Sequence, residues 1–88
     1  MQDHAKDFVN ELIEEFETEF YVDPENIFAG QRALLAALIG VHETVPDDPA
    51  LFNYALDVMR WIAVQRGIRP SKVRQTIRKV YQIIADGE

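Results

Sequence analysis

The stretch 45-VPDDP-49 divides the 88-residue chain into two nearly equal halves and decides how it folds. Proline cannot continue a helix, so Pro46 ends any helix that arrives from the N-terminal side. Asp48 is a favourable N-cap residue and Pro49 suits the first position of a helix, so a new helix is expected to begin directly afterwards. The sequence therefore predicts two helices joined by a tight turn at this point.

Upstream of this break, the spacing of apolar residues predicts two helices. From about Asp3 to Phe20, apolar residues recur at three- and four-residue steps, which is typical of a helix with one buried face. Asp23 and Pro24 then provide an N-cap and a first helical residue for a second helix that ends near Val45. Glycine costs about 1 kcal/mol relative to alanine inside a helix, so Gly30 predicts either a close packing contact or a nearby helix boundary.

Downstream of the break, two further helices are predicted. The third runs from Pro49 to Gly67, which is expected to adopt the left-handed conformation, with Ile68 making the hydrophobic contact just beyond. In the fourth, either Ser71 caps the helix or Pro70 takes its first position. Four amphipathic helices with short connections predict one all-α domain over residues 1–88, an antiparallel up-down-up-down four-helix bundle.

Charge is distributed unevenly along the chain, although the net charge is only −6. Residues 1–48 carry two basic and twelve acidic residues, a net charge of −10, whereas residues 49–88 carry seven basic and three acidic residues, a net charge of +4. In the predicted bundle the first and last helices are neighbours. The acidic surface of the first helix is therefore expected beside the basic surface of the last.

Five glutamates crowd the C-terminal part of the first predicted helix: Glu11, Glu14, Glu15, Glu17 and Glu19. Negative charge is unfavourable at this end of a helix dipole, so we expect this end to fray unless basic residues from the second half of the chain lie near it. The glutamates are interpreted as a solvated acidic face, as an intramolecular dock for the basic half, or as a surface for a partner.

The sequence contains little that supports catalysis or metal binding. Without cysteine there is no disulfide, thiol nucleophile or zinc–thiolate site. Ser71 is interpreted as a helix cap, His42 as a structural histidine, and His4 lies near the terminus. The Glu-x-x-His pairs of a di-metal bundle are absent, as are phosphate-binding, dinucleotide-binding and calcium-binding motifs. We therefore expect no enzymatic activity, no cofactor and no metal site.

Nothing in the sequence predicts a segment that enters or crosses a membrane. The longest apolar stretch, Ala33–Val41, is far shorter than the ~20 residues that span a bilayer. The first residues, MQDH, lack the pattern of a signal peptide. The expectation is a soluble cytoplasmic protein.

The basic second half suggests two kinds of partner. The turn at Gly67 precedes a basic helix, as in helix-turn-helix proteins, and Arg74 and Gln75 are placed to read base edges. The acidic first half would repel phosphates, so nucleic acid is not the expected partner. Alternatively, the basic surface can approach an anionic membrane leaflet.

Aromatic residues in the third predicted helix suggest a protein interface. Trp61 and Tyr54, flanked by Arg60 and Arg66, have the composition of an aromatic–arginine patch that anchors a partner. The other interpretation is that Trp61 is half buried in the bundle.

Short motifs along most of the chain resemble one protein family. Residues 5-AKDFVNEL-12 are similar to the start of the enterocin A-type (pediocin-like, class IIa) bacteriocin immunity proteins, which open with Ala-Lys, an apolar pair and Glu-Leu. Asp48-Pro49 matches an acidic–proline turn of that family, and Ile68-Arg69 falls at its next turn, before an amphipathic fourth helix. The third helix of the family often bears Leu and Asn at positions that correspond here to Leu51, Asn53 and Leu56.

The resemblance implies a four-helix antiparallel bundle in the cytosol of a lactic acid bacterium or a relative. Such proteins protect the producer against its own bacteriocin by recognising, at the inner face of the membrane, the bacteriocin complexed with the mannose phosphotransferase permease. The C-terminal half carries specificity in that family. The expected contact residues are therefore Trp61, Arg66, Arg69, Lys72, Arg74 and Arg78. The alternative is a small helical regulator or adaptor that binds protein or DNA through the same surface, and in either case we expect a monomer.

Overall fold

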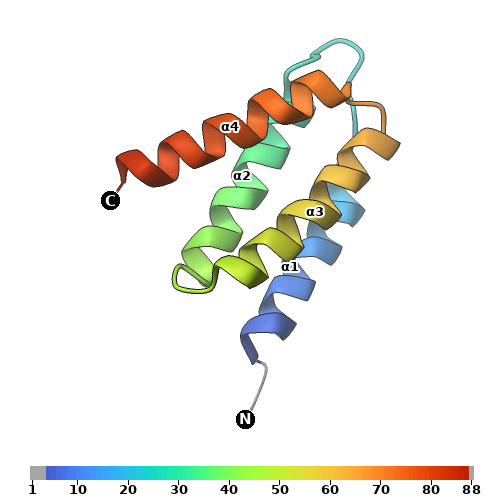
Figure 1. Ribbon diagram of the computed structural model, residues 1–88. Helices are drawn as coiled ribbons and strands as arrows, with labels where there is room; N and C mark the ends of the chain where they lie inside the picture. Colours follow the sequence, from blue (N-terminus) through green and yellow to red (C-terminus); the bar gives the residue numbers. More distant parts are fainter. Residues whose placement is uncertain (1–3, 88) are drawn as a thin grey trace.

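Four helices make up most of the structure, a computed structural model that describes residues 4–87. They are α1 (His4–Glu19), α2 (Ala29–Thr44), α3 (Pro49–Gln65) and α4 (Pro70–Asp86), and the described residues contain no strand (Figure 1). The predicted all-α four-helix bundle is confirmed. Asp3, the expected first residue of the first helix, lies outside the described residues.

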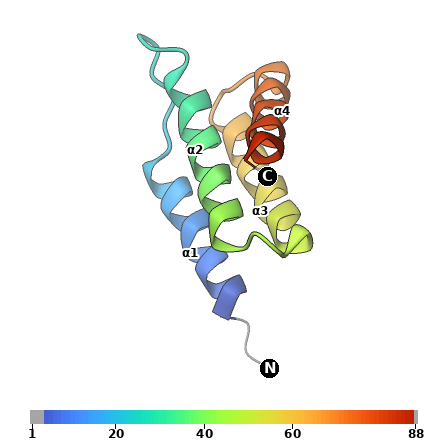
Figure 2. The same cartoon turned by 90° about the vertical axis from the view of Figure 1, so that its left-hand side faces the viewer.

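Helices α2 and α3 form the centre of the bundle, and α1 and α4 lie on opposite sides of this pair. Each central helix packs against the other three, whereas among the described residues no Cα atoms of α1 and α4 come within 8 Å of one another. Figure 2 shows α1 and α4 on opposite sides, and Figure 1 shows α4 crossing α2 obliquely. The prediction that the first and last helices are neighbours, with their acidic and basic surfaces side by side, is therefore wrong.

Apolar side chains from all four helices fill the core, and the central helix α3 supplies the most. The buried helical side chains are Val9, Ile13 and Phe16 of α1, Leu34, Leu38 and Val41 of α2, Phe52, Ala55, Leu56, Met59, Ile62 and Ala63 of α3, and Val73 and Val80 of α4. Thr76 of α4 is also buried, and its hydroxyl donates to the Lys72 carbonyl at 2.9 Å. The polar group of Thr76 is therefore satisfied inside the core.

Residues 20–28 connect α1 to α2 without forming a helix, although the sequence predicts a helix cap at Asp23. The Asp23 carboxylate accepts a hydrogen bond from the Glu25 backbone N–H at 2.9 Å, and the Asn26 side chain accepts one from the Phe28 N–H at 3.2 Å. The Asn26 N–H also donates to the Asp23 carbonyl at 3.0 Å. These local bonds hold turns that compete with a helix, which is why α2 begins only after them.

Helices α3 and α4 both begin at a proline. Asp48 Oδ1 accepts a hydrogen bond at 3.0 Å from the N–H three residues later, so it caps α3, whose first residue is Pro49, as predicted. The loss of such a cap typically costs about 1 kcal/mol. Pro70 is the first residue of α4 and Arg69 occupies the N-cap position, so the alternative in which Ser71 caps this helix is wrong.

The turn between α3 and α4, residues 66–69, has the predicted glycine geometry. Gly67 adopts a φ of 110°, a conformation that residues with a side chain rarely adopt. The N–H groups of Gly67 and Ile68 donate to the carbonyls of Val64 at 3.1 Å and Ala63 at 3.0 Å. This is the Schellman arrangement, which ends a helix sharply and satisfies its last carbonyls.

Ile68 packs directly against the backbone of Gly30 near the start of α2. A Cβ atom on Gly30 would lie 3.0 Å from Ile68 Cδ1 and 3.4 Å from the Phe20 ring. Both alternatives predicted for Gly30 are confirmed, since the residue makes a close contact and lies beside the helix boundary at Ala29. The contact joins the end of α1, the start of α2 and the α3–α4 turn, and it holds the start of α4 against α2.

The packing at Gly30 can be tested by Gly30→Val. We expect this variant to lose about 1–3 kcal/mol of unfolding free energy, because the added methyl groups must displace Ile68 and Phe20. Gly40→Val is the control, since no atom beyond the local backbone of α2 lies within 4 Å of a Cβ at that position, and its stability should change by less than about 0.5 kcal/mol. Urea denaturation followed by circular dichroism measures both. Equal stability of the two variants would contradict the role given to Gly30.

Candidate functional site

Two hollows lie side by side between the start of α2 and α4. The first, of about 220 Å³, is beside the α3–α4 turn and is lined by Val22, Ile27, Gln31, Gly67, Ile68, Arg69 and Lys72. The second, of about 270 Å³, lies further along the same two helices and is lined by Phe28, Gln31, Arg32, Leu35, Gln75, Thr76 and Lys79. Gln31 lines both hollows, so they form one continuous surface, which we call the α2–α4 surface.

Large apolar side chains are exposed at the edge of the α2–α4 surface. Ile27 is 67% exposed, Phe28 56% and Val22 37%, and Tyr21 in the same connection is 68% exposed. Such a concentration of exposed apolar area on a small protein is typical of an interaction site. The sequence pattern misses this feature because it assigns Ile27 and Phe28 to the second helix, whereas α2 begins only at Ala29. The one available signal is the pair of turn-forming Asp and Asn residues that precede them.

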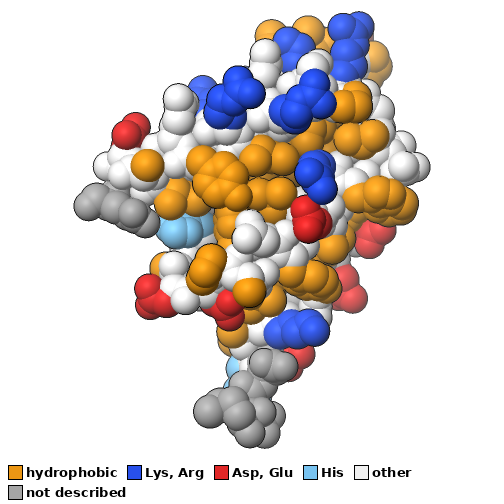
Figure 3. All heavy atoms as spheres, in the orientation of Figure 1, with side chains coloured by type: hydrophobic (Ala, Val, Ile, Leu, Met, Phe, Trp, Pro, Cys, Tyr) orange, Lys and Arg blue, Asp and Glu red, His pale blue; other side chains and the backbone are white. Residues whose placement is uncertain are grey.

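The charged residues that line the α2–α4 surface are all basic: Arg32, Arg69, Lys72 and Lys79. Figure 3 shows Lys and Arg side chains gathered over the end of the bundle where α4 begins, with Asp and Glu mainly over the other half of this face. Within residues 4–87, the one ion pair joins Arg60 to Asp57 at 3.0 Å. The four bases therefore have no acidic partner in the described part of the chain.

The structure distributes the predicted contact residues over different parts of the surface. Arg69 and Lys72 line the α2–α4 surface. Arg74 and Arg78 are exposed on α4 but line neither hollow. Trp61 lies on α3 with 62% of its area exposed, so the interpretation in which it is half buried is wrong.

Arg66, the sixth predicted contact residue, has a structural role. Its Nη1 atom donates a hydrogen bond to the Phe20 carbonyl at 2.9 Å, at the C-terminal end of α1. The last carbonyls of a helix lack hydrogen-bond donors within the helix and carry partial negative charge. The guanidinium group of Arg66 supplies both a donor and a positive charge at this end. A basic residue from the second half therefore lies near the glutamate-rich end of α1, which is the condition under which this end is not expected to fray.

The bond between Arg66 and α1 can be tested by Arg66→Gln. The unfolding free energy should fall by about 1–2 kcal/mol, because a charge-assisted hydrogen bond to a helix terminus is lost. The control is Arg78→Gln, which removes an exposed arginine and should change stability by less than about 0.5 kcal/mol. If urea denaturation gives the same midpoint for both variants, the bond does not stabilise the fold.

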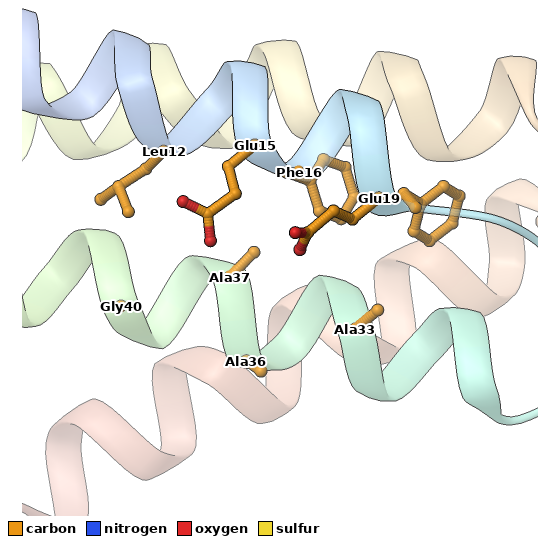
Figure 4. Close-up of a pocket in the computed structure, with 9 residues that line it drawn as sticks. Leu12, Glu15, Phe16, Glu19, Ala33, Ala36, Ala37 and Gly40 are labelled. Carbon is orange, nitrogen blue, oxygen red and sulfur yellow. The ribbon is translucent and has the colours of Figure 1, made fainter.

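A third hollow, of about 440 Å³, is a groove between α1 and α2. Figure 4 shows Glu15 and Glu19 extending from α1 into the space between the two helices. The wall formed by α2 consists of small residues, which leave this space open: Ala33, Ala36, Ala37 and Gly40. All five glutamates of α1 are exposed, as expected of a solvated acidic face. They do not form a dock for α4, because α4 lies on the other side of the bundle.

Other residues singled out from the sequence make contacts within the protein. The Tyr54 hydroxyl donates to Asn10 Oδ1 at 2.8 Å, and Lys6 Nζ lies 5.8 Å from the centre of the Tyr54 ring. His42 is half-buried, with its ring edge-on to that of Phe52 at 6.1 Å between centres. The predicted structural role of His42 is confirmed.

Three further findings concern metal binding, membrane spanning and similarity to known proteins. Among residues 4–87, no three His, Asp or Glu side chains converge so that they could hold a metal ion. In the same part of the chain, no helix combines the length and the apolar character needed to cross a membrane. Comparison of the chain with family models, curated proteins and solved structures gives no match.

Proposed function

We propose that this chain is a bacteriocin immunity protein that acts by binding and has no catalytic activity. Its target would be the complex of a class IIa bacteriocin with the mannose permease, reached from the cytoplasmic face of the membrane. The proposal is supported by the resemblance of 5-AKDFVNEL-12 and of the segment around Asp48-Pro49 to that family. The four-helix bundle that the resemblance implies is also the fold of this protein.

The observation that carries the proposal is a basic surface with no acidic partner of its own. Arg69, Lys72, Arg74 and Arg78 lie on α4 or just before it, and none is paired with an acidic side chain within residues 4–87. The glutamates of α1 lie beyond the central helices, on the other side of the bundle. Near an anionic leaflet each such base contributes about 1 kcal/mol of attraction, which favours a peripheral position at the membrane.

Protection of cells tests the proposal directly. The chain is expressed in a sensitive strain that is then challenged with a panel of class IIa bacteriocins, and protection against at least one of them is expected. The double variant Arg69→Glu/Arg74→Glu should lose protection because both changes reverse charge on the proposed binding surface. The matched control is Glu14→Arg/Glu17→Arg, which reverses two exposed charges on α1 and should still protect.

Circular dichroism of every variant checks that a loss of protection is not caused by a loss of helical content. If the parent chain protects against no bacteriocin in the panel, the proposed function is wrong. If Arg69→Glu/Arg74→Glu protects as well as the parent, these two residues are not contact residues.

A small regulator or adaptor that binds DNA is the second candidate, and one observation favours it. The sequence predicts that the acidic half repels phosphates, but the structure places the α1 glutamates away from the exposed bases of α4. A gel-shift experiment with genomic DNA at increasing salt separates the two candidates. Binding that weakens steeply with salt favours DNA as the partner.

A further inference from the structure

The α2–α4 surface combines two features that its own chain does not use. One is the exposed apolar area of Ile27 and Phe28, and the other is the set of four bases that line the hollows. The two features occur together, since Ile27 lines the same hollow as Arg69, and Phe28 the same hollow as Lys79. A partner that fits this surface must therefore present apolar and negatively charged groups within a short distance of each other.

We infer that the α2–α4 surface is a docking site for an acidic amphipathic helix of a protein partner. The inference rests on the proposed function in that both require this chain to work by binding a protein. It adds the chemical character of the partner's segment, which is a helix with one apolar face and acidic side chains. It also names residues outside the predicted contact set, above all Ile27, Phe28 and Gln31.

The length of the surface suits a short helix. Lys72 and Lys79 line the two hollows and are seven residues apart on α4, which corresponds to about 10 Å at the helical rise of 1.5 Å per residue. A partner helix of two to three turns covers this length, with apolar side chains on the face toward the hollows. Its acidic side chains then lie within reach of the bases, which is the helix-in-groove mode of recognition.

The same surface fits a lipid bilayer less well. Asp23 and Glu25 lie in the connection that also carries Ile27 and Phe28, so insertion of this segment would bring two carboxylates to anionic headgroups. Gln31 also lines both hollows, and its amide can pair with polar groups of a peptide but not with acyl chains.

A designed peptide tests the inference. The probe is a fluorescently labelled 14-residue helix with Leu on one face and Glu on the rest, and its binding is followed by fluorescence anisotropy. The same peptide with Lys in place of Glu should not bind. Ile27→Ser/Phe28→Ser, which leaves the charge unchanged, should weaken binding of the Glu peptide at least tenfold. Arg69→Glu/Lys72→Glu should weaken it to a similar degree.

The matched control is Lys6→Glu/Arg60→Glu, which makes the same change of charge at two exposed residues outside the hollows and should weaken binding less than threefold. The inference is overturned if the parent chain does not bind the Glu peptide. It is also overturned if this control loses as much affinity as Arg69→Glu/Lys72→Glu, or if Ile27→Ser/Phe28→Ser binds like the parent. Circular dichroism excludes unfolding as the cause of any loss.

Vesicles with one-third phosphatidylglycerol are the second arm of the experiment. If the chain binds these vesicles through Ile27 and Phe28 and fails to bind the peptide, the surface is assigned to a membrane and the inference is overturned. The protection assay separates this result from the proposed function. If the chain binds the peptide but gives no protection, the inference is supported and the immunity role is rejected. If the chain protects but does not bind the peptide, the immunity role is supported and the inference is rejected.

Discussion

The close contact between Ile68 and Gly30 determines how the fourth helix is placed. The Schellman turn at Gly67 ends α3 and brings Ile68 into the bundle, where it lies against the bare backbone of α2 and beside the Phe20 ring. Since α4 starts two residues later, its first turns are held against α2. The position of α4 on the side of the bundle away from α1, and the hollows between α2 and α4, both follow from this junction.

Apolar packing overrides charge in this arrangement. The sequence suggests that the acidic first helix and the basic last helix attract each other, yet the structure separates them. Exposed ion pairs contribute only ~0–1 kcal/mol each, whereas burial of a side chain as large as Ile68 contributes about 1.5–3 kcal/mol. One basic residue, Arg66, does reach α1, and it bonds to the Phe20 carbonyl rather than to a glutamate. The net charge of −6 thus combines an acidic side and a basic side that do not neutralise each other.

Features that depend on local sequence are predicted well, and features that depend on distant contacts are not. The cap at Asp48, the left-handed Gly67 and the existence of four helices follow from neighbouring residues alone. The start of α2 is missed because turns formed by Asp23 and Asn26 take the place of its expected first residues. Likewise, a basic residue in the sequence does not reveal whether it lines a hollow, as Arg69 does, or supports another helix, as Arg66 does.

The nine-residue connection 20–28 has a consequence for how this protein can change over evolutionary time. Its backbone is held largely by bonds within the segment, and most of its large apolar side chains contribute little to the core. Substitutions at Ile27 or Phe28 therefore alter the outer surface while leaving the buried contacts of the four helices in place. The exposed side chains of this connection and the buried side chains of the bundle are thus largely different residues, so this part of the surface can diversify while the bundle stays intact.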